Sequence, residues 1–272
     1  MQRFFDAASV AFALVRANFR AQLQYRVSFL LGSFAHLLIT CGELLALWFL
    51  LLRFPSIGGW SFVDLSVLYG IVNLAMTLGD ALANGFDRLP LAIRQGTFDR
   101  LLLRPRSLSL QIIAQDFTLR RMGRGFQGLF ALGYGLSQNQ VLVLGSPQKL
   151  ALIVVCILSG ALIFLGLWVV QGAVSFFSVE SLEAMNVLTY GSSELAQYPF
   201  PIYSRWLRAI FVSLAPLALT SYFPVVALLE KVDPLGTSRA FQWTAPLFGP
   251  VFLWATFAIW RLGVKRYTST GS

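Results

Sequence analysis

Residues 150–177 read LALIVVCILSGALIFLGLWVVQGAVSFF, a run of 28 residues without a charged side chain. A helix needs about 20 mostly apolar residues to cross the hydrocarbon core of a bilayer. The run therefore predicts a membrane-spanning helix. Five further apolar runs lie outward from it along the chain: 27–52, 62–83, 122–144, 206–229 and 246–262. The sequence thus predicts an all-α integral membrane protein with about six transmembrane helices.

The composition favours a membrane protein over a soluble one. Of the 272 residues, 57% are hydrophobic and 12% are charged, whereas soluble domains carry roughly 25% charged residues. In a soluble protein the net charge of +9 would suggest a nucleic-acid partner. Here the Lys and Arg residues sit between the apolar runs, as membrane topology requires. We therefore expect membrane lipid around the chain and no nucleic-acid binding.

Lys and Arg are distributed unequally between alternate loops. With the N-terminus in the cytoplasm, 17 of the 21 lie on cytoplasmic segments, among them Arg205 and Arg208. The outer segments hold the other four, which are Arg53, Lys149, Lys231 and Arg239. Basic residues are enriched on the cytoplasmic side of membrane proteins. Both termini are therefore expected in the cytoplasm, and the chain in a plasma membrane, the inner membrane of a bacterium.

Two parts are expected along the chain: an amphipathic helix over residues 1–26 and a single six-span domain over residues 27–265. The first part repeats apolar residues every three or four positions, at Phe4, Ala8, Phe12, Val15, Phe19 and Leu23. A basic amphipathic helix beside a membrane commonly lies in the interface plane. Two roles stay open for it: a simple anchor, or a helix that also contacts a cytoplasmic partner.

The chain contains none of the common catalytic or cofactor-binding patterns. No Gly-x-x-x-x-Gly-Lys-Ser/Thr loop is present to cradle the phosphates of ATP. The single histidine, His36, lies in the first apolar run, and no cluster has the spacing of a metal site. Cys41 and Cys156 both lie in apolar runs and form no disulfide framework. We expect no enzyme activity, no metal and no cofactor on this chain.

The segment 85–106, GFDRLPLAIRQGTFDRLLLRPR, lies between the second and third runs. Pro90 is suited to the first turn of a short helix, and Gly96 to a left-handed residue that ends it. Thr97 is then expected to cap a second helix over 98–103, and Pro105 to stop it. Phe98, Leu101 and Leu102 give these helices an apolar face. The segment is either a basic cytoplasmic loop with interfacial hydrophobic residues or a docking element for a soluble motor subunit.

Residues 96–105, GTFDRLLLRP, resemble the signature of a group of ABC transporter permeases of the type-2 exporter class. A second run, QYPFPIY at 197–203, followed by Pro216 and by YFP at 222–224, is similar to the same group. One departure is Phe177, where the group has tryptophan. The resemblance implies a half-transporter that dimerises with a second permease, of the same or a different chain, and binds separate cytoplasmic ATPases.

In such an assembly ATP and Mg belong to the partner ATPase, and the segment 85–106 is the coupling element. The residues that the resemblance assigns to coupling are Arg94, Gly96, Thr97, Phe98, Asp99, Arg100, Leu101, Leu102, Arg104 and Pro105. The expected cargo is an amphipathic or hydrophobic molecule that is moved out of the cell.

Two carboxylates, Glu43 and Asp80, fall inside apolar runs. An ionised carboxylate at mid-bilayer costs roughly 2.5–3.5 kcal/mol on insertion scales, so it commonly faces a cavity or a partner. A salt bridge to Arg120 or Arg121 is one role for Asp80, and a gating or cation-binding carboxylate is the other. Pro216, Tyr222 and Pro224 complete the candidate pathway residues, because the two prolines can kink the fifth run.

The sequence leaves two alternative functions open. The first is a secondary transporter driven by an ion gradient, with Glu43 or Asp80 carrying protons. The second is a membrane scaffold or assembly protein that transports nothing. The absence of a convincing internal repeat argues against the secondary transporter, because many of these proteins show two related halves.

Overall fold

The computed structural model describes residues 26–104, 107–115, 122–138, 146–177 and 182–267. Within these ranges every regular element is helical, apart from an isolated bridge between Ile57 and Trp60. The predicted all-α class is confirmed. The predicted amphipathic helix at residues 1–26 lies almost wholly outside the described residues.

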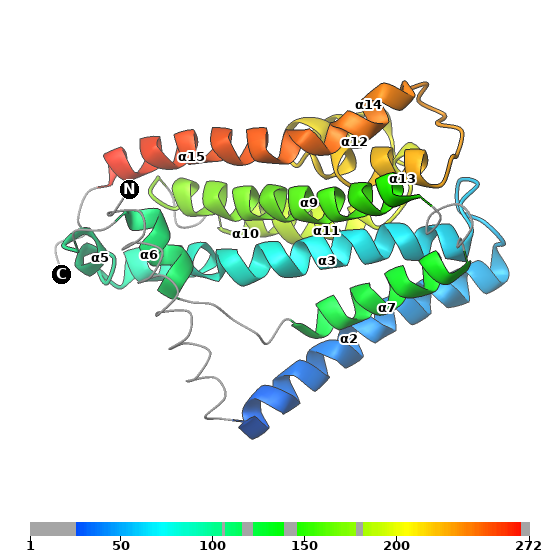
Figure 1. The fold of residues 1–272 in the computed structure, drawn as a ribbon. Coiled ribbons are helices and arrows are strands. Elements are labelled where there is room, and N and C mark those ends of the chain that lie inside the picture. The colour runs from blue at the N-terminus through cyan, green and yellow to red at the C-terminus, as the bar shows by residue number, and fades with distance from the viewer. Residues whose placement is uncertain (1–25, 105–106, 116–121, 139–145, 178–181, 268–272) are drawn as a thin grey trace.

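The long helices are α2 (Arg26–Arg53), α3 (Phe62–Asp87), α7 (Met122–Gln138), α9 (Pro147–Val174) and α15 (Phe248–Arg266). Figure 1 shows α3, α9 and α15 nearly parallel, with α2 and α7 inclined to them. Four stretches of the described chain are long and apolar enough to cross a membrane, and a bent helix pair would be a fifth. These four contain α2, α3, α9 and α15, which correspond to the first, second, fourth and sixth predicted spans. The third predicted span corresponds to α7, of which 17 residues are described.

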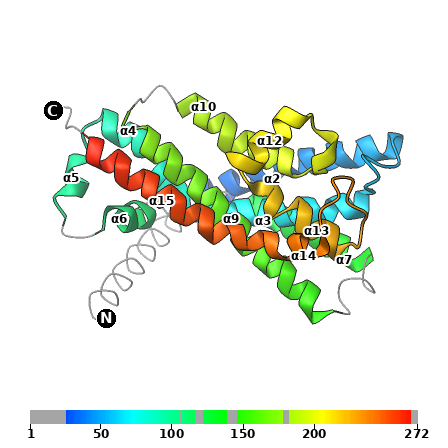
Figure 2. The same cartoon turned by 90° about the horizontal axis from the view of Figure 1, so that it is seen from above.

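One end of the bundle is built around Phe98 and is called here the Phe98 end. It holds the short helices α4 (Leu89–Arg94), α5 (Asp99–Leu102) and α6 (Leu108–Gln115). The Phe98 ring contacts Phe176, just after α9, at 5.2 Å and Tyr267, just after α15, at 4.7 Å between centroids. Both ribbon views place α5 and α6 together at this end (Figure 2).

The opposite end is built around Trp60, in the turn between α2 and α3, and is called the Trp60 end. Trp60 packs on Tyr222 with 5.7 Å between ring centroids. Lys231 Nζ lies 2.9 Å from the Asp64 carboxylate in the first turn of α3. Asp64 also completes a capping box with Ser61, which fixes where α3 begins. These contacts tie residues 222–231 to the start of α3.

The predicted fifth span, 206–229, is not one helix. It is divided into α12 (Arg205–Ser213), the short 3-10 helix η3 (Leu217–Leu219) and α13 (Tyr222–Leu228), and the chain bends by 79° between the two parts. Pro216 lies in the break, as expected of a residue that lacks a backbone donor. Pro224 lies in the first turn of α13, where its missing N–H breaks no helical hydrogen bond. The predicted kink at Pro224 is therefore wrong.

Both ends of this broken pair lie at the Trp60 end. Before α12, Phe200 of the 3-10 helix η2 (Phe200–Ile202) packs on Tyr222 at 5.9 Å. After α13, Lys231 pairs with Asp64. The pair therefore enters the bundle and returns to the same end. As a correction, Arg205 and Arg208, expected on cytoplasmic segments, lie on α12 in this returning pair.

Residues 182–196 instead connect the Phe98 end to the Trp60 end. It consists of α10 (Leu182–Asn186), the π-helical turn η1 (Val187–Gly191) and α11 (Ser192–Ala196). Thr189, Ser192 and Ser193 on this segment are buried. Hydropathy does not find such a segment, because its polar residues face protein rather than lipid.

The last elements are α14 (Arg239–Thr244) and the 3-10 helix η4 (Ala245–Leu247), which lead into α15. The helices differ greatly in how much of their apolar surface the bundle covers. In the most apolar part of α3, 72% of the residues are buried, whereas in α2 the share is 12%. Exposed apolar residues on α2 include Leu30, Phe34, Leu38 and Phe49. In a bilayer such a face contacts lipid or another membrane protein.

Asp233 organises the loop between α13 and α14. Its carboxylate accepts hydrogen bonds from the Tyr222 hydroxyl (2.9 Å), from the Leu235 N–H (3.1 Å) and from the N–H (3.2 Å) and hydroxyl of Thr237. Burial opposes ionisation, but these donors outweigh it and lower the pKa of Asp233 below its usual value of 3.8. Donors that favour the charged form stabilise the folded loop while the carboxylate is ionised.

We expect Asp233→Asn to lower the melting temperature of the detergent-solubilised protein at about pH 7. The stabilisation from Asp233 is fully present above pH 3.8 and is lost as the pH falls through the lower pKa of the folded state. The difference between the native and variant proteins should therefore shrink in acid. Thermal unfolding followed by intrinsic fluorescence measures it. A difference that grows below pH 3.8 would contradict this account.

Candidate functional site: the coupling segment and an intramembrane charge cluster

The backbone of the predicted coupling segment follows its proline and glycine. Pro90 lies in the first turn of α4, and Gly96 has φ +68°, the left-handed conformation expected at the end of that helix. These two predictions about local structure are confirmed. Pro105 lies outside the described residues.

Thr97 has a different role from the expected one. Its hydroxyl donates to the Ala92 carbonyl at 3.2 Å, and the Phe98 N–H reaches the same oxygen at 3.3 Å. Helix α5 begins at Asp99, and no side chain caps it. The prediction of a Thr97 cap is therefore wrong. Phe98 already has helical backbone angles, so Thr97 ties α5 back to α4 instead.

The apolar face of the segment is directed mainly into the bundle. Phe98 is 0% exposed and Leu101 is 8% exposed. The Tyr267 hydroxyl donates to the Asp99 carboxylate at 2.8 Å, next to the ring contact between Tyr267 and Phe98. Phe98 and Asp99 therefore join α5 to the chain just beyond α9 and α15.

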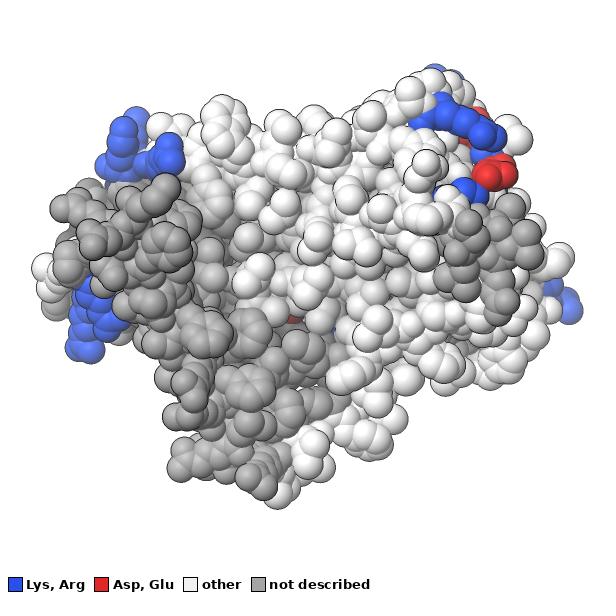
Figure 3. All heavy atoms as spheres, in the orientation of Figure 1, with Lys and Arg blue, Asp and Glu red and all other residues white. Residues whose placement is uncertain are grey.

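The opposite face of the segment is open. Leu102 is 46% exposed and Leu103 is 85% exposed. The exposed face, which we call the basic outer face, consists of Arg94, Arg100, Leu102, Leu103 and Arg104. Figure 3 shows Lys and Arg gathered at both ends of the molecule and a nearly uncharged surface between them.

The two candidate membrane carboxylates lie in different surroundings. Asp80 is 5% exposed on α3, and its expected partners Arg120 and Arg121 lie outside the described residues. Glu43, half-buried on α2, interacts with Glu194 of α11, with Arg124 of α7 and with Tyr69 of α3. The structure does not bring Glu43 and Asp80 into one described site.

Arg124 and Glu194 are the members of this cluster that sequence reasoning missed. Arg124 Nη2 lies 3.8 Å from Glu194 Oε1, and the Arg124 side chain is 14% exposed. Glu194 follows the buried hydroxyl residues Thr189, Ser192 and Ser193. These residues are the feature of the sequence that indicates a polar helix within the bundle. Arg124 is one of the 17 basic residues that the sequence predicts on cytoplasmic segments, because it lies at the start of an apolar run.

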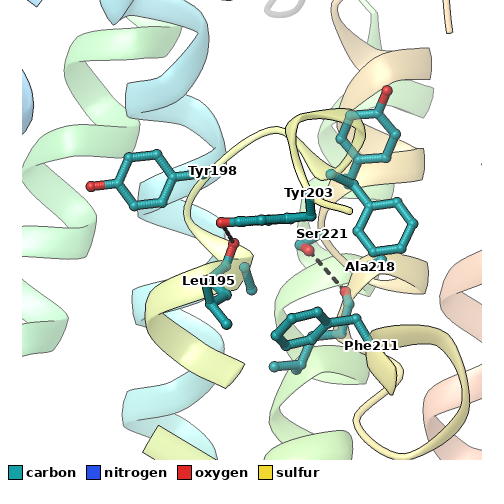
Figure 4. A pocket seen from close by; sticks show the side chains of 10 residues that line it. Leu195, Tyr198, Tyr203, Phe211, Ala218 and Ser221 are labelled. Atoms are coloured by element: carbon teal, nitrogen blue, oxygen red, sulfur yellow. Dashed lines mark hydrogen bonds between the residues drawn. The ribbon is translucent and has the colours of Figure 1, made fainter. Parts of the chain in front are cut away.

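The remaining pathway candidates, Pro216, Tyr222 and Pro224, lie in the broken helix pair and are all buried. Tyr222 also lines a small pocket whose other members include Leu195, Tyr198, Tyr203, Phe211, Ala218 and Ser221 (Figure 4). The Tyr203 hydroxyl crosses it to donate to the Leu195 carbonyl at 2.7 Å. The free volume, about 10 Å³, admits about one water molecule.

Among the described residues, no group of three or more His, Cys, Asp or Glu side chains could hold a metal ion. Neither the curated proteins nor the solved structures contain a match to this chain. The model of the ABC-2 family transporter proteins matches residues 37–271, which include the larger part of α2, the other long helices and the segment around Phe98. The chain therefore belongs to the ABC-2 transporter family and is an ABC transporter permease.

Proposed function

We propose that this chain is the membrane subunit of an ATP-driven exporter and that the segment 85–106 receives the motion of a separate cytoplasmic ATPase. The observation that carries the proposal is the two-sided construction of this segment. Phe98, at 0% exposure, fixes it to the ends of α9 and α15, while the basic outer face is free. A partner pressing on that face would move both long helices.

The side chains at the Phe98 end favour force transmission by a rigid body. A well-packed aromatic core is stiff, so displacement at its surface is passed on rather than absorbed. Phe176 stacks on Phe98 and on Trp260 of α15, at 5.2 and 5.3 Å between centroids. Trp260 in turn meets Phe86 of α3 at 5.1 Å. The coupling segment is thus continuous with three long helices.

We place the Phe98 end in the cytoplasm, with both chain termini on that side of a bacterial inner membrane. The support is the charge at this end: Arg88, Arg94, Arg100 and Arg104 around the short helices, and Arg261, Lys265 and Arg266 at the end of α15. Basic residues near the ends of spans favour the cytoplasmic side. Within the described chain, the Trp60 end carries six basic residues against these seven, Arg53, Lys149, Arg205, Arg208, Lys231 and Arg239, but Lys149 and Lys231 there are paired with Glu230 and Asp64.

In this proposal ATP and Mg bind to the partner ATPase, and the permease itself performs no chemistry. The cargo is amphipathic and leaves the cell. A second permease, identical or different, completes the pathway, and the poorly covered face of α2 is the surface that it would contact. Transport follows because the cargo binds the inward-open and outward-open states with different affinity.

The proposal is tested by purifying the full chain from its native membrane in mild detergent and measuring bound ATPase. We expect a soluble ATPase to be recovered in stoichiometric amount and to hydrolyse ATP. Leu103→Glu should release it, because Leu103 is 85% exposed on the basic outer face. Val232→Glu is the matched control, because Val232 is 92% exposed at the Trp60 end.

Two results would count against the proposal. One is a well-folded preparation without any ATPase, which would favour an ion-driven transporter using Glu43 or Asp80. The other is equal loss of the ATPase in Leu103→Glu and Val232→Glu, because docking would then not be specific to the basic outer face.

A further inference from the structure

Four helices bring polar side chains to one place at the edge of the bundle, where the Arg124 side chain is 14% exposed and that of Glu194 46%. Glu43 comes from α2, Tyr69 from α3, Arg124 from α7 and Glu194 from α11, and the four interact electrostatically. We call them the charge cluster. Their helices are separated in sequence by up to about 150 residues. Placing several charged side chains together within a membrane protein costs free energy. Such clusters are typical of substrate or ion pathways.

The charges within the cluster do not balance. Two carboxylates face one guanidinium, so one negative charge is left over when all three are ionised. The Arg124–Glu194 contact is long, at 3.8 Å, and no described group accepts from Arg124 Nε. Arg124 therefore neutralises the two acids only in part.

Buried polar atoms at the cluster also lack partners among the described residues. The Tyr69 side chain is 1% exposed, and its hydroxyl faces Glu43 without the geometry of a hydrogen bond. Glu43 Oε2 likewise accepts no hydrogen bond from a described group. Buried polar groups are normally satisfied, so these atoms point to a missing partner at this position. The partner must carry positive charge, because two carboxylates and only one guanidinium lie at this position.

Aromatic rings border the charge cluster. Tyr198 interacts with Glu194 and Glu43 through its hydroxyl, while its ring lines the small apolar pocket at the Trp60 end. In Figure 4 that hydroxyl points away from Tyr203 and the rest of the pocket. Aromatic faces attract cations as well as apolar groups. A charged region and an apolar region therefore meet at Tyr198.

We propose that the charge cluster is the binding site for the positively charged group of an amphipathic organic cation. The inference rests on the proposed transport function and names the cargo class that this function would serve. The ammonium or phosphonium group lies between Glu43 and Glu194. The apolar part extends past Tyr198 toward the pocket residues Leu195, Phe211 and Tyr222, whose space must widen in another state of the transport cycle.

Arg124 and the cargo cation together neutralise the two acids. When the site is empty, the guanidinium shares the two carboxylates. When the cation is bound, Arg124 stays beside Glu194 and the cation supplies the second positive charge, so the two acids are balanced. A metal ion is disfavoured as occupant, because the described residues offer no group of three acidic, Cys or His ligands. An anion would add repulsion from two acids.

The test is equilibrium binding to the full chain in lipid nanodiscs, with tetraphenylphosphonium as probe and tetraphenylborate as the nearly isosteric anion. No ATPase is needed, so failure of the site and failure of the exporter proposal are distinguishable. We expect saturable binding of the cation above empty nanodiscs and none of the anion. Equal binding of both ions, or no saturable binding of the cation, would overturn the proposal.

Substitutions then localise the site. Glu43→Gln and Glu194→Gln should each weaken binding of the cation at least tenfold, whereas Glu194→Asp, which keeps the charge, should retain most of the affinity. Glu183→Gln is the matched control, because Glu183 is exposed on α10 of the same segment. Size-exclusion profiles and melting temperatures confirm folding. Unchanged affinity in both Gln variants, or the same loss in Glu183→Gln, would place the cation elsewhere.

Discussion

Phe98→Ala is expected to leave the ATPase bound to the permease but to reduce transport at least about tenfold. Truncating a buried phenylalanine costs about 3–5 kcal/mol in a packed core, and Phe98 is 0% exposed between Phe176 and Tyr267. The basic outer face is not altered, so docking persists. The segment would lose its attachment to α9 and α15, and each tenfold fall in rate corresponds to 1.36 kcal/mol. Transport and ATP hydrolysis in proteoliposomes measure the two effects separately.

Two comparisons make the result specific. Leu91→Ala, on the exposed side of α4 at 55% exposure, should leave transport near the native rate. Leu103→Glu should give the opposite pattern to Phe98→Ala, with the ATPase lost rather than uncoupled. Native transport in Phe98→Ala would show that the aromatic contacts at the Phe98 end carry no motion.

The local structure of the coupling segment could be predicted where backbone stereochemistry decides it. Proline and glycine restrict or extend φ by themselves, so Pro90 and Gly96 occupy the expected positions. Thr97 could not be assigned in this way, because a cap depends on which residue first adopts helical angles. Burial of Phe98 against residues about 80 and 170 positions away decides that question.

Hydropathy identified the spans whose side chains face lipid or a uniformly apolar core, such as α9. It selected residues 206–229 and passed over 182–196, because it measures apolarity and not position. Two buried hydroxyls of 182–196 bond within the segment: Thr189 donates to the Met185 and Asn186 carbonyls, and Ser193 to the Tyr190 carbonyl. Such local bonds make a polar helix tolerable inside a membrane bundle.

The charge cluster could be predicted only in part. Glu43 stands out because it is an acid in a long apolar run. Glu194 and Arg124 do not, since each lies next to other polar residues in the sequence. Their significance comes from the approach of α7 and α11 to α2, and this approach depends on tertiary packing. The sequence alone therefore predicts that a polar site exists within the membrane bundle. Its member residues can be assigned only from the structure.

Gly135→Val is expected to prevent α7 from packing on α3 and to remove most of the folded protein. A Cβ at Gly135 would lie 2.6 Å from Val67 Cγ2 and 3.0 Å from the Val67 backbone nitrogen. Overpacking typically costs about 1–3 kcal/mol, and a backbone atom cannot move aside as a flexible side chain can. Glycine lets two helix backbones approach closely. In lipid the hydrophobic effect does not drive helices together, so such close packing is a usual means of holding them together.

Gly133→Val provides the matched control on the same helix. No atom lies within 4 Å of a Cβ at Gly133, because that face of α7 is exposed. Both substitutions change the helix propensity of α7 equally, so a difference between them reports packing against α3 alone. We expect a monodisperse size-exclusion peak and near-native melting for Gly133→Val, and aggregation or very low yield for Gly135→Val. Equal behaviour of the two variants would mean that the α3–α7 contact does not hold the bundle together.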